Sequence, residues 1–144
     1  MARIRASLGE SGGLTETTLW ENQSPTSDFG SGTNTTTVTL SESIQNFTYI
    51  GVYFKRTKTD TIESNPEYFA TVFISVEDFE KCLSSSLSPQ FCISGRANIS
   101  YVATWVRNIF KNTNTTIDIT ASMQRNGSSN QNSVAIPLKI IGLK

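Results

Sequence analysis

Hydrophobic and polar residues alternate with the period of a β-strand most clearly between Arg96 and Ser122. In this stretch, both parities are rich in the β-branched and aromatic residues that suit a pleated, partly buried surface. The polar segment 111–114 is prone to turn, because asparagine tolerates positive φ, and alternation resumes over 117–121. The pattern predicts a β-hairpin whose first strand, 99–110, is covered on both faces.

Shorter runs of the same kind predict further strands over residues 15–20, 35–40, 48–56, 67–76, 90–94 and 133–143. Gly51 inside the third of these runs indicates a bulge or a close neighbour, and Pro137 predicts that the last strand is bulged or lies at an edge. One short helix is expected over 75–83, because Ser75 can cap a first turn rich in acidic residues.

These elements predict an all-β fold, a single β-sandwich or jelly-roll-like domain of about eight short strands with one short helix. The domain would span residues 14–144. Residues 1–13 hold few apolar side chains and three glycines, so they are expected to form a flexible N-terminal arm or an arm docked on a partner.

Composition supports the strand assignment. About a third of the residues are serine, threonine or asparagine, and only 17% are charged, which disfavours long exposed helices. The net charge is zero, but residues 1–95 hold six basic and eleven acidic residues, whereas 96–144 hold six basic and one acidic. The two parts could attract each other within or between chains, or the asymmetry could be a scatter of small counts.

The absence of histidine excludes His-based acid–base catalysis and most zinc or iron sites. Glu63, Glu67, Glu77 and Asp78 could form a catalytic carboxylate pair, but all lie in or beside predicted loops and are interpreted as surface groups. Asp118 falls on the polar face of its strand, where it would be solvated or paired with Arg107. The sequence therefore predicts no enzymatic activity, no cofactor and no metal.

Cys82 and Cys92 are the only cysteines, and we expect free thiols rather than a disulfide. No apolar run is long enough for a membrane span or a signal peptide, so we expect synthesis in a cytoplasm. The basic cluster 55–58 is interpreted as a solvated turn. Tyr101 and Trp105 share one strand face, which could stack on a sugar ring or belong to the core or a subunit interface.

The two ends of the chain carry a resemblance to a known group of proteins. The residues concerned are Ala2–Ile4, Ser7–Gly9 and Gly12–Gly13, then Thr18–Asn22 (TLWEN), Ser24–Phe29 (SPTSDF), Val38–Ser41 (VTLS) and Ile136–Lys144 (IPLKIIGLK). These motifs resemble small virion proteins of tailed bacteriophages, of the tail-fibre, receptor-binding or head-fibre type. The motifs are structural rather than catalytic, and the middle of the chain follows the group only in pattern.

The resemblance implies a non-enzymatic virion protein, made in the host cytoplasm and exposed on the particle, that mediates attachment to the host surface. Alternatives are a capsid decoration or head-fibre protein, and a monomeric carbohydrate-binding module. Expected partners are other virion proteins, further copies of the chain, and a host cell-surface glycan or protein, with no nucleic acid and no membrane insertion. The receptor-binding residues are not indicated by the sequence.

Two sets of contact residues are predicted on this basis. Arg3, Ile4 and Arg5 would dock the arm on the virion. Val102, Val106 and Phe110 would form the interface of a homotrimer, since the predicted central strand needs cover on its second face.

Overall fold

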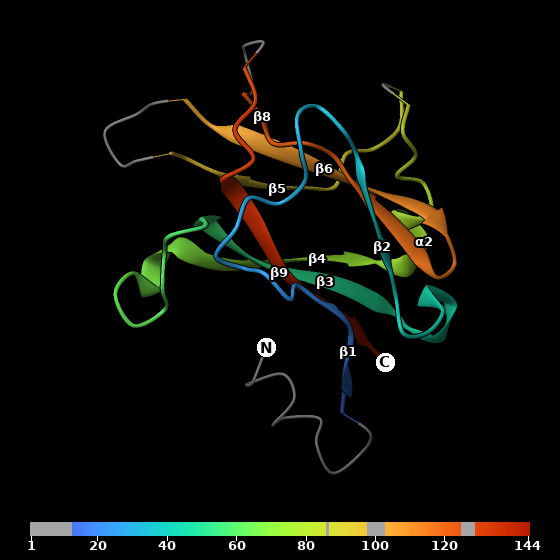
Figure 1. Cartoon of the computed structure of the whole chain (residues 1–144). Helices are drawn as coiled ribbons and strands as arrows, with labels where there is room; N and C mark the ends of the chain where they lie inside the picture. Colours follow the sequence, from blue (N-terminus) through green and yellow to red (C-terminus); the bar gives the residue numbers. More distant parts are fainter. Residues whose placement is uncertain (1–12, 86, 98–102, 125–128) are drawn as a thin grey trace.

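The computed structural model describes residues 13–85, 87–97, 103–124 and 129–144. It consists of two antiparallel β-sheets that pack face to face, with one short α-helix (Figure 1). The predicted all-β sandwich is confirmed.

The first sheet has four strands in the order β1-β9-β3-β4 and the second has the order β2-β7-β6-β5, with β8 also paired to β6. The strands of the first sheet are β1 (Glu16–Glu21), β3 (Tyr49–Thr57), β4 (Phe69–Ser75) and β9 (Val134–Leu143). Those of the second are β2 (Thr36–Thr39), β5 (Cys92–Gly95), β6 (Trp105–Thr113), β7 (Thr116–Ile119) and β8 (Met123–Gln124). The helix α2 (Val76–Phe79) follows β4, and the 3-10 turns η2 (Ile44–Asn46) and η3 (Pro66–Tyr68) precede β3 and β4.

Aliphatic side chains from both sheets fill the space between them. Buried members of the core include Leu19, Val38, Ile50, Val52, Ile93, Ile109, Ile117, Ile119, Ile136 and Ile140. The alternation predicted for β6 is confirmed, because Trp105, Arg107 and Ile109 are buried while Val106 and Phe110 are only half-buried. The side chains of Trp105, Arg107 and Ile109 therefore face the core.

The boundaries of the predicted hairpin differ from the expectation. The strand β6 starts at Trp105 rather than at residue 99, and residues 98–102 lie outside the described part. The strand β6 continues to Thr113, with a register shift between Lys111 and Thr113, through most of the segment expected to turn. Only two residues separate it from β7, which begins at Thr116. The short helix forms in the first part of the expected stretch 75–83. The Ser75 hydroxyl accepts a hydrogen bond from the Asp78 N–H at 3.1 Å, as the capping prediction requires.

The strand β9 occupies an interior position between β1 and β3, so the edge alternative drawn from Pro137 is wrong. The bulge alternative is confirmed. Tyr53 pairs with Lys139 and Phe54 pairs with Pro137, which leaves Leu138 as the extra residue. The missing N–H of proline thus falls where the ladder is already interrupted.

Gly51 fits the prediction of a close neighbour. A Cβ atom at this position would lie 2.6 Å from the ring of Phe73, which is opposite it on β4. The aromatic ring therefore lies across the glycine on the face of the first sheet that points away from the core.

Arg107 is fully buried and donates all its hydrogen bonds to main-chain carbonyls. Its Nε lies 2.7 Å from the Ala135 oxygen and 3.3 Å from that of Val134. Its Nη1 lies 3.1 Å from the Thr120 oxygen, and Nη2 lies 3.0 Å from that of Asn132 and 3.1 Å from that of Val134. The side chain therefore joins β6, the end of β7 and the start of β9.

The backbone that Arg107 holds is unusual, because Ala135 has a φ of 53°, in the left-handed region that non-glycine residues rarely adopt. Burial lowers the pKa of Arg107 to about 10, against the opposing effect of the Asp28 carboxylate, so the guanidinium stays charged at neutral pH. Of the two alternatives for Asp118, solvation or pairing with Arg107, the pairing is wrong, because Asp118 lies opposite Phe110 on the outer face of the sheet whereas Arg107 faces the core. Asp118 instead accepts a hydrogen bond from the Thr37 hydroxyl at 2.7 Å.

We expect Arg107→Met to lower the free energy of unfolding by about 3 to 5 kcal/mol, because it leaves buried carbonyl groups without donors. Arg96→Met is the matched control, since Arg96 is exposed and has no hydrogen bond within the described residues. Urea denaturation followed by circular dichroism measures both. Equal stability of the two variants would contradict the structural role assigned to Arg107.

Candidate functional site

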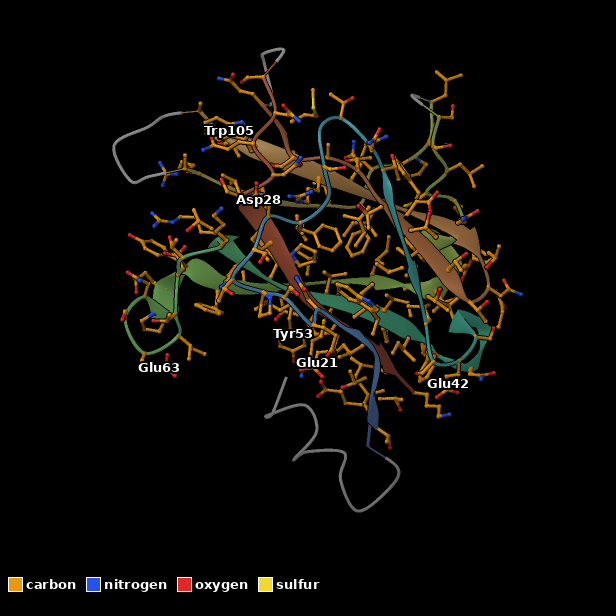
Figure 2. All side chains as sticks on the ribbon, viewed as in Figure 1. Glu21, Asp28, Glu42, Tyr53, Glu63 and Trp105 are labelled. Atoms are coloured by element: carbon orange, nitrogen blue, oxygen red, sulfur yellow. The ribbon has the colours of Figure 1, made fainter. Side chains whose placement is uncertain are left out.

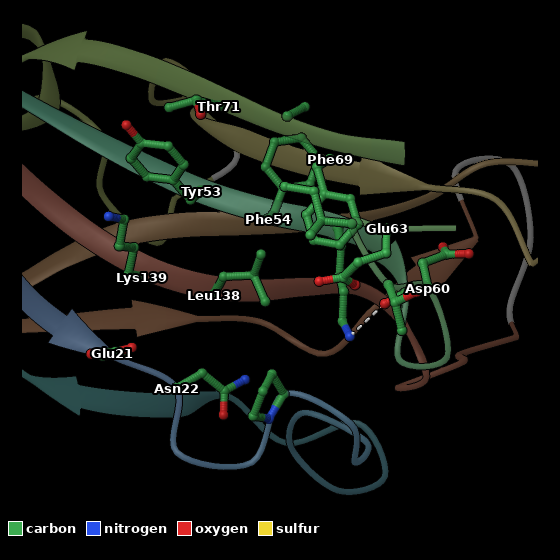
Figure 3. Close-up of a pocket in the computed structure, with 15 residues that line it drawn as sticks. Glu21, Asn22, Tyr53, Phe54, Asp60, Glu63, Phe69, Thr71, Leu138 and Lys139 are labelled. Carbon is green, nitrogen blue, oxygen red and sulfur yellow. Dashed lines mark hydrogen bonds between the residues drawn. The ribbon is translucent and has the colours of Figure 1, made fainter. Parts of the chain in front are cut away.

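A half-open pocket of about 630 Å³ lies beside the bulge in β9, on the outer face of the first sheet (Figure 3). Its apolar lining comes mainly from Leu138, Phe69, Ile62 and Pro25. Its polar lining includes Tyr53, Thr71, Lys139, Glu21, Asn22 and Glu63. Pockets with an apolar lining and a few placed polar groups are the usual binding sites for small ligands.

Strand geometry explains why these side chains meet. Tyr53, Thr71 and Lys139 occupy paired positions on β3, β4 and β9, so they project from the same face of the sheet. Leu138 is the extra residue of the bulge and lies beside them, as Figure 3 shows. Figure 2 shows Tyr53 and Glu21 on the side of the first sheet that faces away from the second.

Asn22 fixes one wall of the pocket to the bulge. Its main-chain N–H donates to the Leu138 oxygen at 2.8 Å, and its side-chain amide donates to the Pro137 oxygen at 2.9 Å. The amide oxygen accepts a hydrogen bond from the N–H of Ser24 at 2.9 Å, which shapes the loop that carries Pro25. This wall is therefore held by the main chain of β9 as well as by its own turn.

Asp60 fixes the opposite wall. Its buried carboxylate accepts hydrogen bonds from the N–H and hydroxyl of Thr57, at 2.9 and 3.0 Å, and from two nitrogens of Arg56, at 3.0 and 3.1 Å. The Lys55 ammonium donates to the carbonyls of Lys58 and Asp60, both at 3.0 Å. Burial lowers the pKa of Lys55, while the Asp60 charge acts in the opposite direction.

The expectation that residues 55–58 form a solvated basic turn is therefore wrong for its first two members. Lys55 is only 4% exposed, and the Arg56 guanidinium lies 3.7 Å from the centre of the Tyr68 ring. Lys58 is the more exposed member and pairs with Asp28 at 2.7 Å. Because these charges are used within the wall, they are not available to a ligand.

The groups that remain for a ligand lie at the rim and floor. Glu21 and Glu63 are exposed, and neither carboxylate has a hydrogen bond or ion pair within the described residues. The Lys139 ammonium lies 4.6 Å from the centre of the Tyr53 ring and 3.7 Å from the Glu16 carboxylate. The Lys139 charge is thus paired, and the pocket offers an aromatic and aliphatic surface with two hydrogen-bond acceptors, which suits a ligand with an apolar face and hydroxyl groups.

The residues proposed from sequence as contact sites do not contribute to this pocket. Arg3, Ile4, Arg5 and Val102 lie outside the described residues. Val106 and Phe110 lie on the outer face of the second sheet, where Val106 lines a separate hollow.

The candidate sugar-stacking pair is not assembled in the described part of the chain. Trp105 is buried in the core, so its face is not available for stacking, and Tyr101 lies outside the described residues. The four carboxylates considered as a catalytic pair are all exposed, as expected. Glu63 and Glu67 precede β4, whereas Glu77 and Asp78 follow it, so the length of the strand separates the two sets.

The pocket could not be predicted from the sequence, because its residues come from four separated segments of the chain. The alternation in β3 does place Tyr53 on one face, but nothing local indicates that Leu138 and Asn22 meet beside it. No cluster of three or more residues able to ligate a metal occurs among the residues that the structure describes.

Comparison with known proteins gives no family assignment, since no family model matches the chain and no curated protein matches it. Within the described ranges, no helix is long and apolar enough to cross a membrane.

Both cysteines are free thiols, as predicted, but their environments differ. Cys82 is fully buried, and its thiol lies 3.6 Å from the carbonyl oxygen of Asp78. Burial, assisted by the Asp78 charge, raises the pKa of Cys82, whereas Cys92 is exposed on β5.

We expect iodoacetamide at neutral pH to alkylate Cys92 in the native protein and Cys82 only after unfolding, because the thiolate is the reactive form. Peptide mass spectrometry after timed quenching distinguishes the two sites. Native Cys92→Ser should resist labelling, and rapid labelling of Cys82 in that variant would contradict its buried placement.

Proposed function

We propose that this protein is a non-enzymatic virion protein of a tailed bacteriophage, of the tail-fibre or receptor-binding type, exposed on the particle and mediating attachment to the host surface. The sequence motifs that resemble such proteins supply the first support. The contacts between those motifs supply the second.

The motifs from the two ends of the chain pack against each other, which is the observation that carries the proposal. The TLWEN segment lies in and after β1, the IPLKIIGLK segment forms most of β9, and these strands are neighbours. Asn22 of the first motif bonds to Pro137 of the second. Phe29 lies edge-on against Trp20, with ring centres 5.9 Å apart, and its N–H donates to the Asn132 oxygen at 3.0 Å. The residues of these motifs thus pack together in one part of the first sheet and the loop after β1.

The pocket on this part of the first sheet supports a binding role. Its walls are held by the hydrogen bonds that Asn22 donates and Asp60 accepts, so the backbone that carries the pocket is pre-organised. A saccharide ring can place its apolar face on Tyr53 and Leu138 while its hydroxyl groups donate to Glu21 and Glu63. A glycan of the bacterial surface is therefore the ligand class that we assign to the pocket.

The homotrimer stays a separate part of the proposal. The half-buried Val106 and Phe110 give it an apolar surface on the outer face of the second sheet. A capsid decoration or head-fibre protein is the alternative, and it differs in its position on the particle and in copy number. A monomeric carbohydrate-binding module would use the same pocket without a virion.

The virion assignment is tested on purified particles of the phage that encodes the chain. We expect quantitative mass spectrometry to detect the protein at low copy number, and antibody labelling to place it on the tail. Abundant labelling over the capsid would favour the decoration alternative. Absence from intact particles would reject a virion role.

We expect purified protein added to host cells to reduce phage adsorption, and Tyr53→Ala to weaken this competition about tenfold by removing the aromatic surface. Tyr49→Ala is the matched control, because Tyr49 is an exposed tyrosine on the same strand that does not line the pocket. Glu63→Gln should also weaken competition, whereas Glu67→Gln should not.

Glycan-array binding of the same four variants separates the two parts of the proposal. Sugar binding that depends on Tyr53, without any effect on adsorption, would favour the carbohydrate-binding module. Equal behaviour of the Tyr53 and Tyr49 variants in both assays would reject the pocket as the binding site.

A further inference from the structure

The strand β4 forms one edge of the first sheet and pairs with β3 over its whole length. The register runs without a bulge from the pair of Tyr49 and Ser75 to that of Lys55 and Phe69. Among the residues that the structure describes, no strand pairs with the other side of β4.

The hydrogen-bonding groups on that other side can be assigned from the ladder. The N–H of Val76 donates to the Thr48 oxygen at 2.9 Å, which fixes the alternation of the antiparallel pair. The main-chain groups of alternate residues from Ile74 back to Ala70 therefore point to β3, and those of Thr71, Phe73 and Ser75 point away. Within the described part of the chain, Thr71 and Phe73 make no main-chain hydrogen bond outside the strand ladder. Ser75 is also the N-cap of α2, so its N–H is free while its carbonyl accepts the first hydrogen bond of that helix.

The edge lacks the usual protection against pairing. Natural edge strands are kept apart by charges, prolines, bulges or short length. The sequence FATVFIS has no charge and no proline, and its residues from Thr71 to Ser75 are all half-buried rather than covered. The Phe73 ring extends over Gly51 of β3, away from the free side of β4, so it does not block the approach of another strand.

The other sheet edges that the structure describes are protected. The strand β1 has Glu16 and Glu21 at its ends and a register shift between Thr18 and Trp20. The strands β2 and β5 have only four residues each, and β8 has two. Of these edges, β4 is thus the one that offers a long, neutral and regular partner.

We infer that β4 pairs with the β4 of a second copy of this chain, antiparallel about a twofold axis at Val72. This register places Thr71 opposite Phe73, so the outward main-chain groups of these residues meet. At each end it places Ser75 opposite Phe69, where the Ser75 N–H meets the Phe69 carbonyl, because the Phe69 N–H is already bonded to the Pro66 oxygen. It also places the small Ala70 opposite Ile74, and no like charges meet within the paired strands. Glu67 and Glu77 lie just beyond the strand ends, in η3 and α2, where the same register brings Glu67 of one copy opposite Glu77 of the other.

The two first sheets then form one continuous sheet across the dimer. This inference does not rest on the virion assignment or on the pocket's ligand. It is also distinct from the predicted threefold interface, since Val106 and Phe110 lie on the second sheet.

Light scattering of the full chain over a range of concentrations tests the pairing. We expect a particle of twice the 15.8 kDa chain mass that dissociates on dilution. Thr71→Pro should weaken dimerisation at least about tenfold, because it removes an N–H of the new ladder from each copy while the ladder to β3 is kept. Thr71→Val is the matched control, because it retains the N–H and should dimerise normally.

Thr71→Lys is a second disrupting variant, since it places like charges near the axis without restricting the backbone. Circular dichroism establishes that each variant is folded. Hydrogen exchange provides an independent measurement on the unmodified chain, in which the amides of Thr71, Phe73 and Ser75 should be protected at high concentration and exchange quickly after dilution.

A monomer at the highest soluble concentration, with these amides exchanging quickly, would overturn the inference. So would an oligomer that folded Thr71→Pro and Thr71→Lys variants leave unchanged. Protection of these amides only inside assembled particles would assign the edge to a different virion protein and would also overturn it.

Discussion

The structure depends on hydrogen bonds to the buried carbonyl groups at the start of β9, where this strand enters the first sheet. Arg107 donates these hydrogen bonds. At Val134 and Ala135 the chain turns into the sheet through a left-handed conformation, and its carbonyl oxygens point into the core rather than along a ladder. Buried carbonyl groups without donors are costly, and a guanidinium supplies several donors from one side chain. Gly95 permits the close approach, since a Cβ there would lie 2.6 Å from the oxygen of Arg56 and 3.2 Å from the nitrogen of Ala135.

The candidate site follows from the same strand. Once the start of β9 is held by the second sheet, Pro137 interrupts the ladder and Leu138 is displaced as the bulge residue. The loop after β1 can then attach through Asn22 to the carbonyl groups exposed at this interruption. The pocket therefore lies where a local defect in pairing exposes both apolar surface and main-chain acceptors. A regular ladder at this point would have left a flat sheet face.

Local patterns in the sequence were sufficient for the class of fold and for most strands, because alternation reports which side of a strand is buried. They were sufficient for the capping role of Ser75 and for the close neighbour of Gly51. They failed where the outcome depends on distant segments. The alternation places Arg107 on the same strand face as apolar residues. Its hydrogen-bond partners are main-chain carbonyl groups, which every residue has, so the sequence does not indicate them. Pro137 indicated an edge or a bulge, and only the pairing with β1 and β3 decided between them.

The central place of β9 has a consequence for the order of events during synthesis. Both of its neighbours, β1 and β3, are synthesised before it. More than a hundred residues are added to the chain between the synthesis of β1 and that of its partner β9. The hairpin of β3 and β4 can form early, but the sheet cannot be completed until Val134–Leu143 is available. Folding is therefore dominated by contacts between distant parts of the chain, which predicts slow, late and cooperative assembly of the first sheet.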